Sequence, residues 1–130
     1  MRNLTILLAL IFTVTFSSTS FADWKKVTEN VNGDSFYVDI ERIRKHGGYV
    51  YYWKLGVYLK PDKWGNLSAK VYKQGDCELF RYKNLSFSSY KEPMGGRTGE
   101  FNNKPDKDWS YPPPDSSVET ILKAVCRYAN

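Results

Sequence analysis

The stretch from Pro112 to Tyr128 constrains the fold most, because it predicts a helix with one apolar side that another layer has to cover. The consecutive prolines at its start lack backbone donors and end any preceding strand. Ser116 and Glu119 have the spacing of a capping box, which marks the first turn of a helix. Apolar residues then recur every three or four positions, at Val118, Ile121, Leu122, Val125 and Cys126.

Residues 1–22 have the pattern of a cleaved signal peptide. Arg2 precedes an apolar run from Leu4 to Phe16, which is the length of a signal core and is shorter than the roughly twenty residues of a spanning helix. Small residues at Ser20 and Ala22 fit a signal peptidase site. We expect cleavage after Ala22 and export of residues 23–130 as a single domain, either to the periplasm or onward to the cell surface or medium. The residue directly after the cleavage site is not a cysteine, so we expect no lipid anchor and no stable membrane anchor.

The only two cysteines, Cys77 and Cys126, are expected to form a disulfide. Export places them in an oxidising compartment, where two cysteines allow a single intramolecular pairing. A catalytic thiol or a zinc site would need further ligands or a partner histidine, and the one histidine, His46, stands in a turn-like setting. The disulfide would tie the C-terminal helix to the strand-like region around Cys77.

Segments rich in β-branched and aromatic residues predict an antiparallel β-sheet of about five to six strands, which with the helix gives an α+β fold. The longest, Tyr49–Lys60, is apolar on both sides and is expected to be central. Gly56 within it indicates a bulge or a bend. The other expected elements are strands at 23–27, 35–40, 67–74 and 109–111, a run opening at Cys77 that is either one strand or two up to Ser89, a helical turn at 41–46 and an exposed loop at 92–108.

Composition and motifs argue against nucleic-acid and cofactor chemistry. The net charge is +5, spread without a block of like charges and without a nucleic-acid-binding motif. The glycine-rich segment 95–99 lacks the ending of a phosphate loop, and no histidine- or cysteine-rich metal pattern is present. We therefore expect no cofactor, no metal and no nucleic acid partner.

A catalytic role has one weak candidate. A small secreted nuclease or hydrolase could use His46 with Glu41 and Arg44, but all three stand in one turn, whereas acid, base and phosphate-binding groups normally come from separate elements. Asp39 and Glu41 form a carboxylate pair that fits a solvated strand end. We expect a protein that is not an enzyme.

Aromatic residues beside cations are the stronger signal. The chain has ten tyrosines and four tryptophans, and Tyr, Trp and Arg are the residue types enriched in binding hot spots. Plain sheet surface is the alternative interpretation, because aromatics also favour strands. The candidate partner-binding residues are Tyr58, Lys63, Trp64, Tyr72, Arg81, Tyr82 and Tyr90.

The order of these features resembles the surface-adhesin protein E family of Gram-negative bacteria. The resemblance rests on Trp24, the segment 36–39 followed by Ile43, Trp53, the segment 68–70, Asp76-Cys77, the segment 93–95, the segment 109–113 and Cys126. It implies an antiparallel sheet tied to a helix by the disulfide, and binding to host extracellular-matrix or serum proteins. A soluble periplasmic or envelope-associated module with a bacterial partner is the alternative. The partner, the oligomeric state and the binding face stay open.

Overall fold

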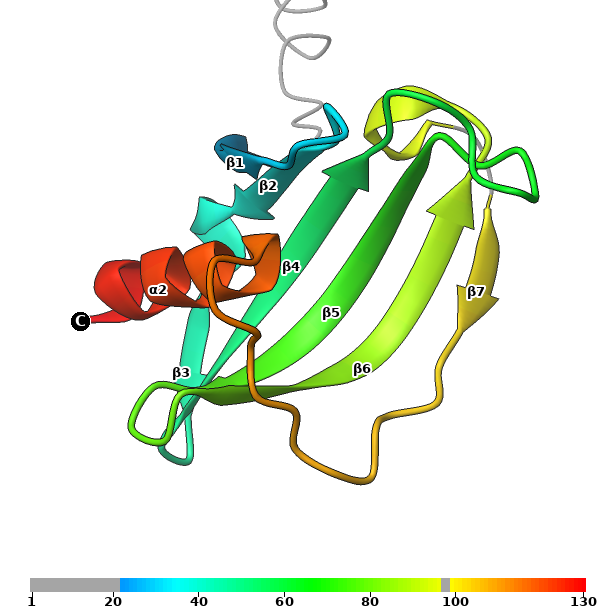
Figure 1. The fold of residues 1–130 in the computed structure, drawn as a ribbon. Helices are drawn as coiled ribbons and strands as arrows, with labels where there is room; N and C mark the ends of the chain where they lie inside the picture. Colours follow the sequence, from blue (N-terminus) through cyan, green and yellow to red (C-terminus); the bar gives the residue numbers. More distant parts are fainter. Residues whose placement is uncertain (1–21, 97–98) are drawn as a thin grey trace, which may run out of the picture.

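The structure, a computed structural model, describes residues 22–96 and 99–130, which form one antiparallel sheet crossed by one α-helix (Figure 1). The strands are β1 (Trp24–Glu29), β2 (Ser35–Asp39), β3 (Arg44–His46), β4 (Tyr49–Val57), β5 (Ser68–Asp76), β6 (Arg81–Tyr90) and β7 (Glu100–Asn102). Their spatial order is β1-β2-β4-β5-β6-β7, with β3 paired to β4 beside that path. The predicted α+β class is confirmed. The predicted signal peptide lies, except for Ala22, outside the described residues.

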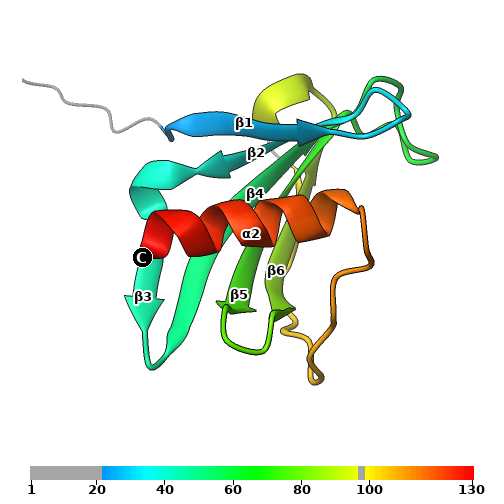
Figure 2. The ribbon, with the colours of Figure 1, turned by 60° about the vertical axis from the view of Figure 1, so that its left-hand side comes forward.

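Helix α2 (Ser117–Ala129) supplies one half of the core. Ser116 caps it, since its hydroxyl accepts a hydrogen bond from the Glu119 amide at 3.2 Å. The Glu119 carboxylate reaches back to the amide of Asp115, at 3.3 Å, one residue before the amide that a capping box would use. Figure 2 shows α2 running across the sheet. The main core cluster consists of Phe36 and Val38 from β2, Val50 and Tyr52 from β4, and Ile121, Leu122 and Val125 from α2.

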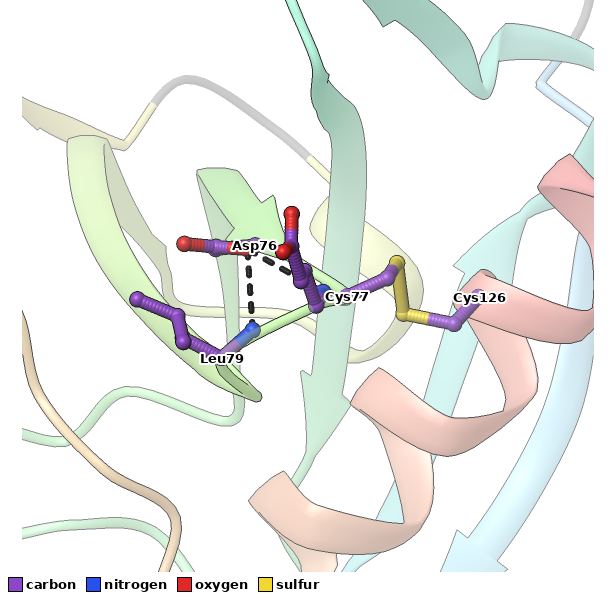
Figure 3. Close-up of a disulfide and its surroundings, with 5 residues drawn as sticks. Asp76, Cys77, Leu79 and Cys126 are labelled. Atoms are coloured by element: carbon purple, nitrogen blue, oxygen red, sulfur yellow. Dashed lines mark hydrogen bonds between the residues drawn. A yellow bond between two sulfur atoms is a disulfide. The ribbon is translucent and has the colours of Figure 1, made fainter.

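The predicted disulfide between Cys77 and Cys126 is present and joins the end of α2 to the turn between β5 and β6 (Figure 3). Cys77 does not open a strand, as the sequence pattern predicted, because β5 continues through Asp76 and the chain then turns. The Asp76 carboxylate accepts hydrogen bonds from the amides of Glu78 and Leu79, both at 3.1 Å, which bends the backbone out of the extended form.

The run after this turn is one strand, β6, with an irregularity at its middle. Tyr72 of β5 pairs with Ser86 and Lys73 pairs with Asn84, so Leu85 has no partner on β5 and forms a bulge. Of the two predictions at Gly56, a bulge or a bend, the bulge is absent, since Gly56 pairs regularly with Phe36 and Ala69. A Cβ at this position would make a tight contact with the Phe36 ring, at 3.3 Å.

Two short strands replace structure that the sequence predicted otherwise. The segment expected as a helical turn splits into a 3-10 turn, η2 (Ile40–Arg42), and strand β3, which pairs with the start of β4. The segment expected as a loop contains the 3-10 turn η3 (Pro93–Gly95) and strand β7, which pairs with β6. Ser110, expected in a final strand, makes an isolated bridge to Tyr82. For β3, β7 and Ser110, an adjacent strand edge offers backbone partners that local propensity does not reveal.

The sheet is strongly curved. Trp24 of β1 and Phe101 of β7 belong to the two ends of the strand order, yet both line a cavity of about 290 Å³ on the face opposite α2. Within residues 22–96 and 99–130, no helix combines the length and the apolarity needed to cross a bilayer.

Candidate functional site

The face of the sheet that carries α2 is covered only in part. The helix packs on β2 and β4, and Figure 1 shows β6 and β7 lying clear of it. At the outer end of this uncovered area lies a groove of about 440 Å³, which we call the Trp64 groove. Its lining comes from the loop between β4 and β5, the end of β6 and all of β7: Asp62, Trp64, Asn66, Phe87, Ser89, Lys91, Glu100, Phe101 and Asn102.

Three large aromatic side chains in the Trp64 groove are exposed to solvent. Trp64 is 67% exposed, Phe101 64% and Phe87 43%. Phe87 lies on the helix-bearing face but beyond the reach of α2. Phe101, the register partner of Ser88, lies on the opposite face of the edge strand β7, and it reaches the Trp64 groove from there. Exposed aromatics gathered at one concavity mark an interaction site, because each side chain gains free energy when a partner removes it from water.

The loop that carries Trp64 is held in place by its own hydrogen bonds. Asp62 accepts from the amides of Trp64, at 2.9 Å, and Asn66, at 2.8 Å. The Asn66 amide, followed by the Trp64 amide, holds the pKa of the Asp62 carboxyl below its usual value. Lys91 donates to the Trp64 carbonyl and so links the loop to the end of β6. An ordered loop loses little conformational entropy when a partner binds.

The charges around the Trp64 groove are mixed. The ammonium group of Lys63 lies 4.4 Å from the centre of the Trp64 ring. Asp62, Glu100 and Lys91 line the groove itself. An aromatic centre with charges of both signs at its edge fits an amphipathic protein surface better than a uniformly anionic partner.

The candidate partner-binding residues lie on both faces of the sheet. Lys63 and Trp64 lie at the Trp64 groove, and Tyr58 lies at the start of the same loop, where burial, followed by Asp62 and Asp34, raises the pKa of its hydroxyl. Tyr82 lies on the helix-bearing face, with its ring centre 4.1 Å from the Lys73 ammonium. These four residues share a face.

Tyr72, Arg81 and Tyr90 lie on the opposite face. The Tyr72 ring packs against Trp53, with ring centres 4.8 Å apart. Arg81 forms an ion pair with Asp76 at 2.9 Å and covers the Trp109 ring, while Tyr90 lies under the Lys70 ammonium. The structure therefore does not bring the seven predicted residues together at one site.

Phe87 and Phe101 were missed by sequence reasoning. Phe101 stands among polar and charged residues in a segment that has the composition of a loop. The sequence therefore does not indicate that Phe101 is an exposed residue of an edge strand. Phe87 belongs to an alternating strand pattern, and such a pattern predicts a buried side chain unless the extent of the covering helix is known.

The residues of the nuclease hypothesis do not converge on a cavity as acid, base and phosphate-binding groups would. Arg44 uses its guanidinium to hold the backbone carbonyls of Glu41 and Ile43, at 2.9 and 3.2 Å. The carboxylate pair is split as well, since Asp39 is buried, with Arg42 3.6 Å away, whereas Glu41 is exposed. Among the described residues, no group of three or more His, Cys, Asp or Glu side chains could hold a metal ion.

Comparison with known proteins agrees with this architecture. The family model described as surface-adhesin protein E matches residues 24–127. Among solved structures, crystal form II of Haemophilus influenzae protein E is similar, with a TM-score of 0.62 and 20% sequence identity over 86% of this chain and 94% of that chain. At this identity the likeness shows a shared fold. No curated protein matches the sequence.

Proposed function

The chain belongs to the surface-adhesin protein E family, and we propose from this that it is an exported, non-enzymatic protein that binds another protein through the Trp64 groove. The partner would be a host extracellular-matrix or serum protein. The residues that we assign to the contact are Trp64, Phe87 and Phe101, with Lys63 and Tyr58 beside them.

The observation that carries the proposal is the gathering of Trp64, Phe87 and Phe101 around one groove. Aromatic side chains at the centre of an interface, surrounded by polar groups, supply most of the binding free energy in many complexes. Tyr72 and Arg81 are poor candidates for the same contact, because their rings and charges already pack within the opposite face.

Binding of the purified protein to immobilised matrix and serum proteins tests the proposal. Replacing both Trp64 and Phe101 by alanine should weaken binding at least tenfold, since each hot-spot truncation costs about 2 kcal/mol or more. The matched control is Leu79→Ala, which removes another exposed apolar side chain, 55% exposed, from the turn between β5 and β6. Equal loss in the control, or full binding by the double variant, would contradict the assignment.

Cell fractionation tests the location separately. If the protein reaches the host, antibodies should detect it on intact cells or in the medium. Protein found only in osmotic-shock fluid would instead favour a bacterial partner in the envelope, and the same pair of variants should then be tested against envelope extract.

A further inference from the structure

A second cavity, of about 380 Å³, lies on the helix-bearing face between the start of α2 and β6. Val71, Phe87 and Val118 provide apolar walls, and Lys73 and Asn84 lie at its base. Its volume is within the range of about 300–1,000 Å³ that is usual for small-molecule sites. The Trp64 groove adjoins it, because Phe87 and Asn102 line both.

Lys73 and Asn84 face each other across β5 and β6. They are register partners, so their side chains leave the sheet on the same side, directly beside the bulge at Leu85. Bulges often occur next to functional sites, where they redirect a side chain.

Both side chains carry polar atoms that make no hydrogen bond with the described residues. Lys73 is 2% exposed, and its ammonium group makes no hydrogen bond or ion pair with any described residue, only a contact with the Tyr82 ring. The Asn84 Oδ1 atom is buried and accepts no hydrogen bond from residues 22–96 or 99–130. Buried polar groups without partners cost free energy, so their presence beside a cavity points to a ligand.

The surrounding charges favour an anion in the cavity, because three lysines there stand against one carboxylate. Burial and, to a smaller extent, Lys54 of β4 lower the pKa of Lys73 to about 7, against an opposite effect of Asp106. Tyr52 of β4 and Tyr82 of β6 flank Lys73, and Lys104 lies at the cavity wall. The Asp106 carboxylate accepts a hydrogen bond from the backbone amide of Asn84 at 2.9 Å. It would repel a dianion more strongly than a monoanion.

We propose that this cavity binds a small organic monocarboxylate with an apolar body and a hydrogen-bond donor next to the carboxylate. The carboxylate would pair with the Lys73 ammonium, the donor would reach Asn84 Oδ1, and the apolar body would lie against Val71 and Phe87. Free N-acyl amino acids and the C-terminal residue of a peptide share this chemistry. The site shares the Phe87 wall with the Trp64 groove, but Lys73 and Asn84, which would hold the ligand, lie outside that groove.

Titration calorimetry on the protein produced from the full chain tests the ligand class. N-acetyl-leucine should bind at least tenfold more tightly than N-acetyl-leucinamide, which lacks the charge, and than 4-methylpentanoate, which lacks the donor. Inorganic phosphate should bind more weakly than N-acetyl-leucine. A pentapeptide that ends in leucine with a free carboxylate distinguishes the two kinds of ligand. If it binds as tightly as N-acetyl-leucine, the ligand is the C-terminus of a peptide; if it binds more weakly, the ligand is a small acid. No binding of N-acetyl-leucine, or equal binding of its amide, overturns the proposal.

The proton balance gives a second readout, which a purely structural lysine would not produce. At pH 8 the free Lys73 amine is mostly neutral, so a bound carboxylate should draw a proton from the buffer. The binding heat should then differ between Tris and HEPES in proportion to their ionisation heats. Lys73→Met should bind at least tenfold more weakly and lose the buffer dependence, whereas Lys45→Met, at an exposed position, should retain both.

If Lys73→Met does not fold, the buffer comparison on the unmodified protein still tests the role of Lys73. A second variant, Asn84→Leu, should reduce the preference for N-acetyl-leucine over 4-methylpentanoate. A binding heat that is the same in both buffers at pH 8 would refute the role of Lys73.

Discussion

Leu122 of α2 packs directly on the bare Cα of Gly75 in β5. A Cβ at Gly75 would lie 2.9 Å from Leu122 Cδ1 and 2.9 Å from Val50 Cγ2. The helix can approach the sheet closely here only because the residue has no side chain. One glycine therefore sets how near the two layers of the core can come.

Gly75→Ala should destabilise the protein by about 1–3 kcal/mol, because the added methyl group overpacks a core without free space. Thermal unfolding followed by circular dichroism measures the change. The double variant Gly75→Ala, Val50→Ala relieves one of the two overlaps, so its loss should be smaller than the sum of the single losses. If the losses of the two single variants simply add in the double variant, the helix and the sheet can move apart at this point without strain, and the prediction is wrong.

Cys126→Ala should lower the unfolding midpoint by at least about 10 °C. The disulfide closes a separation of 49 residues, for which the chain-entropy model gives about 4 kcal/mol, and about 1 kcal/mol moves the midpoint of a domain of this size by about 4–8 °C. Reductant should produce the same loss in the unmodified protein and none in the variant. An unmodified protein that is indifferent to reductant contradicts this prediction.

Ser116→Ala should cost about 1 kcal/mol of folding free energy, because the Glu119 amide loses its acceptor at the start of α2. Ser116→Asp should retain most of the stability, since a carboxylate can accept the same hydrogen bond. Ser117→Ala is the matched control, as it lies one residue into the helix. Chemical denaturation gives all three values, and a loss in Ser117→Ala equal to that in Ser116→Ala would rule out the cap.

Asp76→Asn should reduce stability at pH 7 and flatten its dependence on acid pH. Burial alone would raise the pKa of Asp76, but hydrogen bonds from the Leu79 amide, Arg81 and the Glu78 amide outweigh it and hold the pKa below the ordinary value of 3.8. A depressed pKa in the folded state stabilises the protein above about pH 4. This contribution disappears as the pH falls through the folded-state value.

Thermal unfolding midpoints measured between pH 7 and pH 2 test whether the ionised Asp76 carboxylate stabilises the folded state. The unmodified protein should lose stability below about pH 4 more steeply than Asp76→Asn. Glu78→Gln is the control, because it removes a neighbouring carboxylate whose side chain takes no part in this turn. Parallel curves for the unmodified protein and Asp76→Asn would contradict the role of the carboxylate.

The sequence was sufficient to predict the class of fold and the helix because their signals are local or covalent. The stripe at Ile121, Leu122 and Val125 has a clear helical period, and two cysteines allow one pairing. The turn at Cys77 was missed because it depends on a side chain, that of Asp76, which binds two amides after the strand. Strands β3 and β7 were missed because three residues gain a strand conformation only from a neighbouring edge.

The candidate site could be predicted only in part for a related reason. Trp64 stands out in a polar loop, so it was predicted. Phe87 is exposed because α2 stops short of the outer strands, whereas Phe101 is exposed because it lies on the edge strand β7, on the face opposite α2. Tyr72 and Arg81 were grouped with Trp64 by composition, although the curved sheet places them on its other face. Composition identifies residue types that bind, and register decides which of them share a surface.

The core joins the two ends of the described domain, since Phe36 and Val38 of β2 pack with Ile121 and Val125 of α2. The core around the early strands is therefore incomplete until α2 is present, so it closes only when the last element of the domain is available. The disulfide between Cys77 and Cys126 has the same requirement, because its second cysteine belongs to the last turns of the helix that completes the core.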